Sequence, residues 1–127
     1  MVVDTSALLA VVFHESLGPW VVDQLQANRE YLLMSSVNYA EVLMLLQSKQ
    51  PTHAALIREA IEQTSIQVVP TTPTHAEIAA AARLKYPLNM GDCFAYALAK
   101  EEDCPLLTLD RDFRNTDITV VLPRRVS

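Results

Sequence analysis

Short apolar runs alternate along the chain with longer segments in which apolar residues recur every three or four positions. The short runs are rich in Val, Ile and Leu and are bounded by Ser, Pro, Asp or Thr, which is typical of β-strands. The longer segments have the spacing of helices. Strands are predicted over residues 1–3, 31–34, 66–69, 105–109 and 118–122. Helices are predicted over residues 5–14, 19–28, 38–48, 52–64, 73–84 and 91–102.

This alternation of strands and helices predicts an α/β fold. Strands that are apolar on both faces occur in parallel sheets covered by helices, joined by right-handed crossovers. We therefore expect a three-layer α/β/α sandwich with a mostly parallel sheet. Pro51 should divide the long middle helical region, because proline removes a backbone donor and clashes with the preceding turn. The chain has 127 residues and neither internal repeats nor a linker-like tract, so one domain over residues 1–127 is expected.

Composition and the first residues indicate where the protein acts and whether its cysteines form disulfides. Half of the residues are apolar, but no apolar run approaches the roughly 18 residues that cross a membrane. Val2 and Val3 follow Met1 without the basic segment and cleavage site of a secretory leader. We expect a soluble, cytoplasmic protein with no membrane partner. Cys93 and Cys104 are too few for a four-thiolate zinc site and are expected to be free core thiols.

The net charge leaves a nucleic-acid partner open. Fifteen acids against ten bases give a formal charge of −5, which ordinarily disfavours nucleic acid. If four acids line a cation site, however, the other eleven nearly balance the ten bases. The distribution of the acids therefore matters more than their sum.

Four acids stand at boundaries between predicted strands and helices. Asp4 follows the first strand and has the position of a helix N-cap. Glu41 stands three residues after Asn38, the spacing of a capping box. Asp92 lies in the first turn of a helix, where the helix dipole favours negative charge. Asp110 ends a strand, where aspartate is an ordinary turn residue. Each acid alone therefore has a structural explanation.

Together the four acids indicate one site. The carboxyl ends of parallel strands and the helices that follow them meet at one edge of the sheet, where such folds bind ligands. In a doubly wound sheet of order 3-2-1-4-5, Asp4 and Asp110 follow the neighbouring strands 1 and 4. Glu41 lies on the helix that follows strand 2, which is the other neighbour of strand 1. Asp92 joins them if residues 85–90 carry the chain back to this edge, which their length permits.

Crowded carboxylates repel one another unless a cation compensates their charge. A ligand set of oxygens, without cysteine or histidine nearby, suits Mg²⁺ or Mn²⁺ rather than Zn²⁺. One or two such ions can activate water and stabilise the leaving oxygen of a phosphodiester. Hydrolysis of a nucleic acid is therefore the hypothesis that the acids support.

Four segments, in this order, resemble a PIN domain: VVDTSALLAVVFHE, SSVNYAEV, GDCFAYALA and LLTLDRDF. Within that family the chain is similar to the short toxins of the VapC type, which are ribonucleases of bacterial toxin–antitoxin pairs. The resemblance implies a metal-dependent endoribonuclease that hydrolyses RNA and acts as a toxin. It also implies that four acids hold Mg²⁺ or Mn²⁺ in the active site: Asp4, Glu41, Asp92 and Asp110.

The resemblance extends to residues beside the acids. Thr5, Ser6 and Thr108 match small hydroxyl positions, where hydrogen bonds would orient the carboxylates. Asp112 matches a second acid that often follows the last one, ahead of an aromatic residue such as Phe113. Whether Asp112 is a ligand, a supporting residue or merely solvated is left open.

The last motif also carries two arginines. The expectation is that Asp110 points at the metal while Arg111 projects outward and Phe113 anchors the loop in the core. Arg111 and Arg114 are candidates for binding RNA phosphates. The alternative is that both are solvated loop charges.

Two protein partners are implied by the resemblance alone. One is a cognate antitoxin, whose C-terminal segment would lie in an apolar groove, and the other is a second copy of the chain in a homodimer. Apolar residues on helices flanking the site are candidates for the groove, although each fits the core equally well: Trp20, Val21, Leu25, Tyr39, Leu43 and Leu46.

Two alternatives belong to other functional classes. A receiver-like phosphoacceptor module also clusters acids around Mg²⁺, but it needs a lysine after its last-but-one strand. The segment after Leu109 has Asp110, Arg111 and Asp112 instead, and residues 66–70 lack the aspartate expected at the end of a middle strand. A catalytically idle Mg²⁺-binding module that acts through a protein partner is the other alternative, and the presence of all four acids disfavours it.

Overall fold

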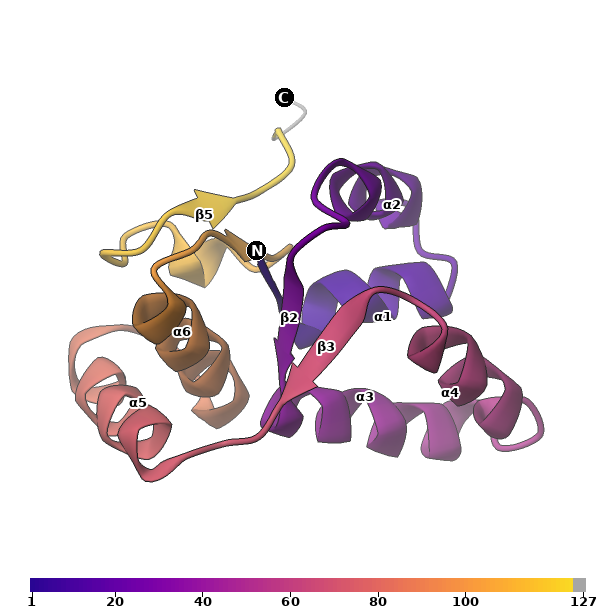
Figure 1. The fold of residues 1–127 in the computed structure, drawn as a ribbon, viewed down its shortest axis with the longest axis horizontal. Helices are drawn as coiled ribbons and strands as arrows, with labels where there is room; N and C mark the ends of the chain where they lie inside the picture. The colour runs from indigo at the N-terminus through magenta and orange to yellow at the C-terminus, as the bar shows by residue number, and fades with distance from the viewer. Residues whose placement is uncertain (125–127) are drawn as a thin grey trace.

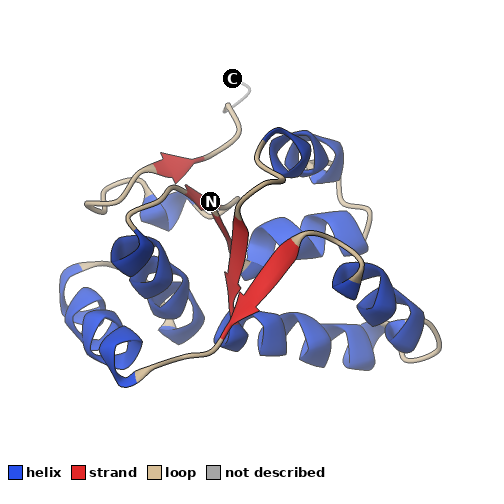
Figure 2. Cartoon of the chain, viewed as in Figure 1, coloured by secondary structure: helices blue, strands red, loops and turns tan. Residues whose placement is uncertain are grey.

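The computed structural model describes residues 1–124, which form one five-stranded sheet covered by helices on both faces (Figures 1 and 2). All strand pairs are parallel, and the order is β3-β2-β1-β4-β5. The predicted α/β/α sandwich is therefore confirmed. The strands are β1 (Val2–Val3), β2 (Leu32–Ser35), β3 (Ile66–Val69), β4 (Leu106–Leu107) and β5 (Val120–Val121). The helices are α1 (Thr5–Val12), α2 (Gly18–Ala27), α3 (Ser36–Lys49), α4 (Ala54–Glu62), α5 (Pro73–Lys85), α6 (Met90–Glu102) and the 3₁₀ helix η1 (Arg111–Phe113).

Alternation along the strands divides the core between two layers of helices. Val2 and Leu106 belong to a buried cluster with α5 and α6, whereas Val3 and Leu107 belong to a cluster with α1, α2, α3 and α4. Successive strand residues point to opposite faces, so even two-residue strands contribute to both layers. Figure 1 shows α5 and α6 on one side of the sheet and the other four helices on the opposite side. Phe113, predicted to anchor its loop, is fully buried.

Each helix boundary lies within two residues of the prediction, and the shift at the start of α3 bears on the acids. The Ser35 hydroxyl accepts a hydrogen bond from the Val37 amide at 3.2 Å, so the helix starts at Ser36 rather than Asn38. Asn38 consequently lies inside the helix, and the capping-box explanation of Glu41 is wrong. Pro51 lies between α3 and α4, as predicted.

The hydrophobicity of the helices and the state of the cysteines were also predicted. No helix among residues 1–124 is long and apolar enough to cross a membrane. Cys93 and Cys104 are both free, but only Cys93 is fully buried while Cys104 is half-buried.

Candidate active site

Asp4 occupies the junction of β1 and α1 and is nearly inaccessible. Its carboxylate accepts hydrogen bonds from the Ala7 amide at 2.9 Å and the Ser6 hydroxyl at 2.7 Å, and its other oxygen accepts one from Thr108. The Ala7 contact makes Asp4 the N-cap of α1, as predicted. The side chain is 3% exposed. Burial raises the pKa of the Asp4 carboxyl to about 6, because its three hydrogen bonds offset the loss of hydration only in part.

Thr108 and Ser6 connect Asp4 to the end of β4. The Thr108 hydroxyl also accepts a hydrogen bond from the Asp110 amide at 2.9 Å, and the Ser6 hydroxyl accepts one from the Leu109 amide at 3.0 Å. Both hydroxyls therefore hold the loop that carries Asp110 against the start of α1. The hydrogen bonds to a carboxylate predicted for these two residues are the ones that they donate to Asp4.

Glu41 extends from the second turn of α3 toward the start of α1. Its Oε1 accepts hydrogen bonds from the Thr5 hydroxyl at 2.8 Å and from Asn38 Nδ2 at 3.1 Å. Thr5 thus contacts Glu41 rather than Asp4, the acid next to it in sequence. Glu41 as a whole residue is half-buried.

Asp92 belongs to a reciprocal cap at the start of α6. The Asp92 amide donates to Asn89 Oδ1 at 2.8 Å, and the Asp92 carboxylate accepts from the Asn89 amide at 3.1 Å. Burial is the largest cause that raises the pKa of Asp92 to about 6, and the negative charges of Asp110, Glu41 and Asp112 raise it further. Asp92 therefore lies within electrostatic range of acids from two other elements.

The Asp110 loop differs in part from the prediction. Asp110 caps η1 by accepting a hydrogen bond from the Asp112 amide at 2.9 Å, and the Asp112 side chain is exposed. Arg111 does not project freely into solvent, because it donates to the Pro123 carbonyl at 3.0 Å and is half-buried. Arg114 is exposed, and its Nε donates to the Arg111 carbonyl at 3.3 Å. Of the two arginines, Arg114 is the more accessible to a ligand.

The acids fit a hydrated divalent ion better than a closed metal cage. Among residues 1–124, no three Asp, Glu, His or Cys side chains converge closely enough to hold an ion as they stand. Mg²⁺ usually keeps several waters and uses only one or two carboxylates, so a closed shell is not required. The buried Asn38 Oδ1 has no hydrogen-bond partner among the described residues. The all-oxygen donor set and the uncompensated charge both suit such an ion.

Gly91 makes the close approach of α3 and α6 possible. A Cβ at this position would lie 2.7 Å from Glu41 Cδ, well inside van der Waals contact. The missing side chain leaves the space that the Glu41 carboxylate occupies. The start of α6 and the Glu41 side chain therefore form one packed unit.

A model of the PIN domain family matches residues 1–118. The chain belongs to the PIN domain family. Ribonuclease VapC28 of Mycobacterium tuberculosis is 34% identical over 134 residues, which cover 98% of this chain and 100% of that protein. The resemblance found in the four sequence motifs is therefore confirmed.

Solved structures share the fold of this PIN domain. Mycobacterium tuberculosis VapC20, described as a sarcin-ricin loop cleaving toxin, has a TM-score of 0.78 at 21% identity, covering 96% of this chain and 98% of that one. A toxin–antitoxin complex from Klebsiella pneumoniae contains a chain with a TM-score of 0.78 at 22% identity, covering 98% of both chains. The likeness extends over nearly the whole of each chain.

Three residues of this PIN domain that contact the acids were not predicted to belong to the site: Asn38, Asn89 and Gly91. Asn89 stands three residues before Asp92, which is a recognisable capping spacing. Gly91 is one of only two glycines in the chain and directly precedes Asp92, so its position was also a readable signal. The spacing of Asn38 and Glu41 was noticed but was interpreted as a helix cap, and the other two partners of Asn38 come from distant segments.

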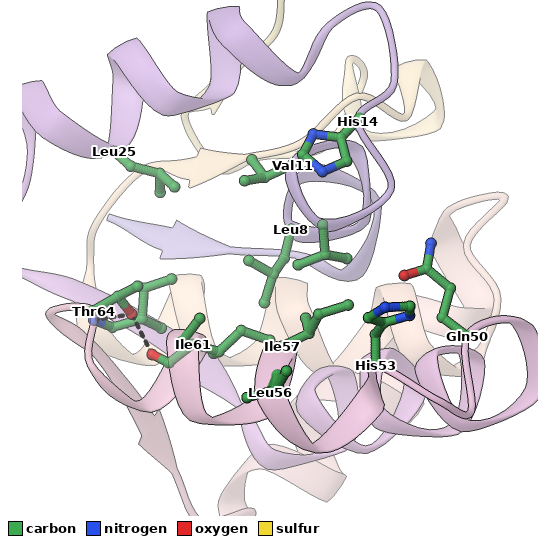
Figure 3. A pocket seen from close by; sticks show the side chains of 13 residues that line it. Leu8, Val11, His14, Leu25, Gln50, His53, Leu56, Ile57, Ile61 and Thr64 are labelled. Carbon is green, nitrogen blue, oxygen red and sulfur yellow. Dashed lines mark hydrogen bonds between the residues drawn. The ribbon is translucent and has the colours of Figure 1, made fainter.

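An apolar pocket of about 600 Å³ lies away from the acids, between α1, α2 and α4 (Figure 3). Leu8 of α1 and Ile57 of α4 point toward one another across it, and His14, His53 and Gln50 line one end. Of the six residues predicted for an apolar groove, only Leu25 lines this pocket. Val21 and Leu46 are fully buried in the core and are not available to a partner.

Proposed function

We propose that this protein is a single-domain, Mg²⁺- or Mn²⁺-dependent endoribonuclease and the toxin of a toxin–antitoxin pair. The observation that carries the proposal is the gathering of Asp4, Glu41, Asp92 and Asp110 at the carboxyl edge of the sheet, with burial and mutual repulsion raising the pKa of Asp92 to about 6. VapC28, a relative that matches over its full length, is named a ribonuclease. A cytoplasmic location is part of the proposal, because a cellular RNA substrate would be found there.

The acids would hold the ion, and their neighbours would keep them in place. A bound divalent ion supplies charge compensation and polarises water and phosphate oxygens. Ser6 and Thr108 orient the Asp4 carboxylate, and Thr5 orients Glu41. The exposed Asp112 assists through its amide, which fixes the Asp110 carboxylate.

Phosphate binding belongs mainly to Arg114, which is exposed beside the acids on the η1 loop. Arg111 contributes less, because its guanidinium is engaged by the Pro123 carbonyl. Phosphate contacts of this kind position a nucleic acid without reading its sequence.

Cleavage of total RNA by the purified, antitoxin-free protein tests the proposal. We expect cuts with Mg²⁺ or Mn²⁺, none with a chelator, and none with Asp92→Asn. The cut sites would identify the RNA target. If a folded wild-type protein cuts no RNA with either metal, the idle metal-binding module is the better description.

The antitoxin is proposed to place an apolar segment in the pocket between α1, α2 and α4. Leu56 at the edge of this pocket is 66% exposed, so a large apolar side chain faces solvent when no partner is bound. A fold relative of this chain occurs in a toxin–antitoxin complex.

A homodimer is proposed from the family, and the oligomeric state in solution tests it.

A further inference from the structure

Asn38 is a buried amide that joins the elements carrying the acids. The residue is 1% exposed on α3. Its Nδ2 lies 3.1 Å from Thr5 Oγ1, 3.1 Å from Glu41 Oε1 and 3.0 Å from the Gly91 carbonyl, so its two hydrogens are shared among three acceptors. These three acceptors belong to α1, α3 and α6. One side chain therefore contacts the three α-helices that carry or adjoin Asp4, Glu41 and Asp92.

The chemistry of the neighbours determines the orientation of the Asn38 amide. The Glu41 carboxylate and the Gly91 carbonyl can only accept hydrogen bonds, so the amide nitrogen must face them. The reverse orientation would place Oδ1 against two acceptors. Asn38 is thus the donor that two electronegative groups share.

The contact between α3 and α6 depends on that shared donor. Gly91 lies so close to Glu41 that a Cβ would overlap the carboxylate, at 2.7 Å from Cδ. Glu41 Oε1 and the Gly91 carbonyl lie 3.1 and 3.0 Å from the same Asn38 nitrogen, and without that donor these two acceptors would repel each other. Asp92 follows Gly91 directly, so any shift of the first turn of α6 moves the Asp92 carboxylate relative to Glu41.

We propose that Asn38 is a positioning residue, which sets the separation of Glu41 and Asp92 by holding the first turn of α6 against α3. The consequence for metal binding and cleavage rests on the proposed function. The positioning itself is a property of the metal-free protein and is testable without it.

Three variants test this role. Asn38→Leu has a similar shape and removes the donor, and Asn38→Asp replaces the donor with an acceptor. Tyr96→Phe is the matched control, because it removes the hydrogen bond that a buried side chain on α6 donates to Asp117 and leaves every hydrogen bond of Asn38 in place. Asn38→Ser, which keeps a shorter donor, replaces the first two if neither folds.

Amide hydrogen exchange of the metal-free proteins is the first measurement. The Asp92 and Cys93 amides, both hydrogen-bonded to Asn89, should exchange about tenfold faster or more in the Asn38 variants, relative to the middle of α6. Tyr96→Phe should leave that ratio unchanged. Equal protection of these amides in wild type and Asn38 variants overturns the proposal.

Mn²⁺ affinity, measured by electron paramagnetic resonance on folded samples, is the second measurement. The Asn38 variants should bind Mn²⁺ about 10- to 100-fold more weakly, as found for residues that orient metal ligands, and should need more metal for half-maximal cleavage. Unchanged Mn²⁺ affinity despite faster exchange overturns the proposal, since Asn38 would then only stabilise the helix. A wild type that neither binds Mn²⁺ nor cuts RNA, with the exchange result as expected, supports the positioning role and rejects the nuclease.

Discussion

Gly91 and Gly18 are the only glycines in the chain, and each allows a close contact of a different kind. A Cβ at Gly91 would overlap the Glu41 side chain, whereas a Cβ at Gly18 would lie 2.7 Å from the Ala10 carbonyl oxygen in the backbone. A side chain can rotate away from such a clash, but backbone cannot move without disturbing packing. A substitution at Gly91 should therefore affect mainly the site, and a substitution at Gly18 should affect mainly the fold.

Gly91→Ala should impair cleavage far more than stability. The new Cβ displaces the Glu41 carboxylate, and a displacement of this size is expected to lower kcat/KM by about 10- to 100-fold. Stability should change little, because alanine is about 1 kcal/mol better than glycine inside a helix and offsets the strain. RNA cleavage assays and thermal unfolding of the same samples measure both quantities.

Gly18→Ala provides the control with the opposite pattern. It should lower the melting temperature while activity per folded molecule is retained at low temperature. Full activity in Gly91→Ala would show that Glu41 tolerates the displacement and is not required in its observed place.

At the scale of elements, α6 carries a polar network at the end opposite to Asp92. The Asp117 carboxylate accepts hydrogen bonds from Lys100 at 2.7 Å and from the Tyr96 hydroxyl. The hydrogen bond from Lys100, followed by that from Tyr96, lowers the pKa of Asp117 to about 2. This network ties the loop before β5 to α6.

Asp117→Asn should destabilise the protein slightly at neutral pH and not in acid. A carboxyl whose pKa is lowered from 3.8 in the folded state contributes stability above about pH 4, and this contribution disappears as the pH falls toward 2. The effect is small because Asp117 and Lys100 are both largely exposed. Urea unfolding at about pH 7, 4 and 2.5 measures it. A difference between wild type and variant that persists undiminished at the lowest pH contradicts the expectation.

The helix α4 carries the exposed side of the apolar pocket. Leu56→Asp should weaken antitoxin binding by about tenfold or more, because a charge would be buried against an apolar segment. The isolated toxin should keep its melting temperature, since Leu56 is 66% exposed. Titration calorimetry with the cognate antitoxin is the measurement.

Leu84→Asp is the matched control for this experiment. Leu84 is 90% exposed on α5, which lies on the other face of the sheet. Its substitution should leave the affinity unchanged. Equal losses in both variants would place the antitoxin elsewhere or attribute the loss to added charge alone.

At the scale of the whole molecule, the sheet order concentrates negative charge at one edge. The order β3-β2-β1-β4-β5 places the ends of β1 and β4 side by side, and the Asp4 amide donates to the Leu107 carbonyl at 3.2 Å. Burial raises the pKa of both Asp4 and Asp92 to about 6. The folded, metal-free protein therefore binds protons more tightly than the unfolded chain between about pH 4 and 6.

Divalent metal should stabilise the protein strongly near pH 7.5 and weakly near pH 5. These two carboxyls make metal-free stability fall as the pH rises from about 4 to 6, and a bound ion compensates the charge above that range. At about 100 times the dissociation constant, Mn²⁺ should contribute about 2.7 kcal/mol, or roughly 5–10 °C in melting temperature. Near pH 5 protons compete with the ion. Scanning calorimetry with Mn²⁺ and then with a chelator tests this, and an equal shift at both pH values contradicts it.

Much of the fold was predictable because its signals are local. Apolar runs and helical periodicity identified every strand and α-helix, and errors were confined to ends such as Ser36, where a serine cap starts α3 earlier than expected. The four acids were also predictable as a group, since parallel strands bring their carboxyl ends to one edge. Their separation was not, because it depends on how closely α3 and α6 pack.

The sequence by itself determined the order of strands and helices, the two-faced burial of the inner strands β1, β2 and β4, and the acids at strand ends, since periodicity and capping act over a few residues. Only the tertiary structure decided that Asn38 reaches the Gly91 carbonyl, 53 residues away, and that Arg111 is held by Pro123. It also decided that the open apolar pocket involves α4 rather than most of the residues predicted for it. Such contacts arise when whole helices pack against the sheet, and hydrogen-bond partners are then selected by distance in space rather than along the chain.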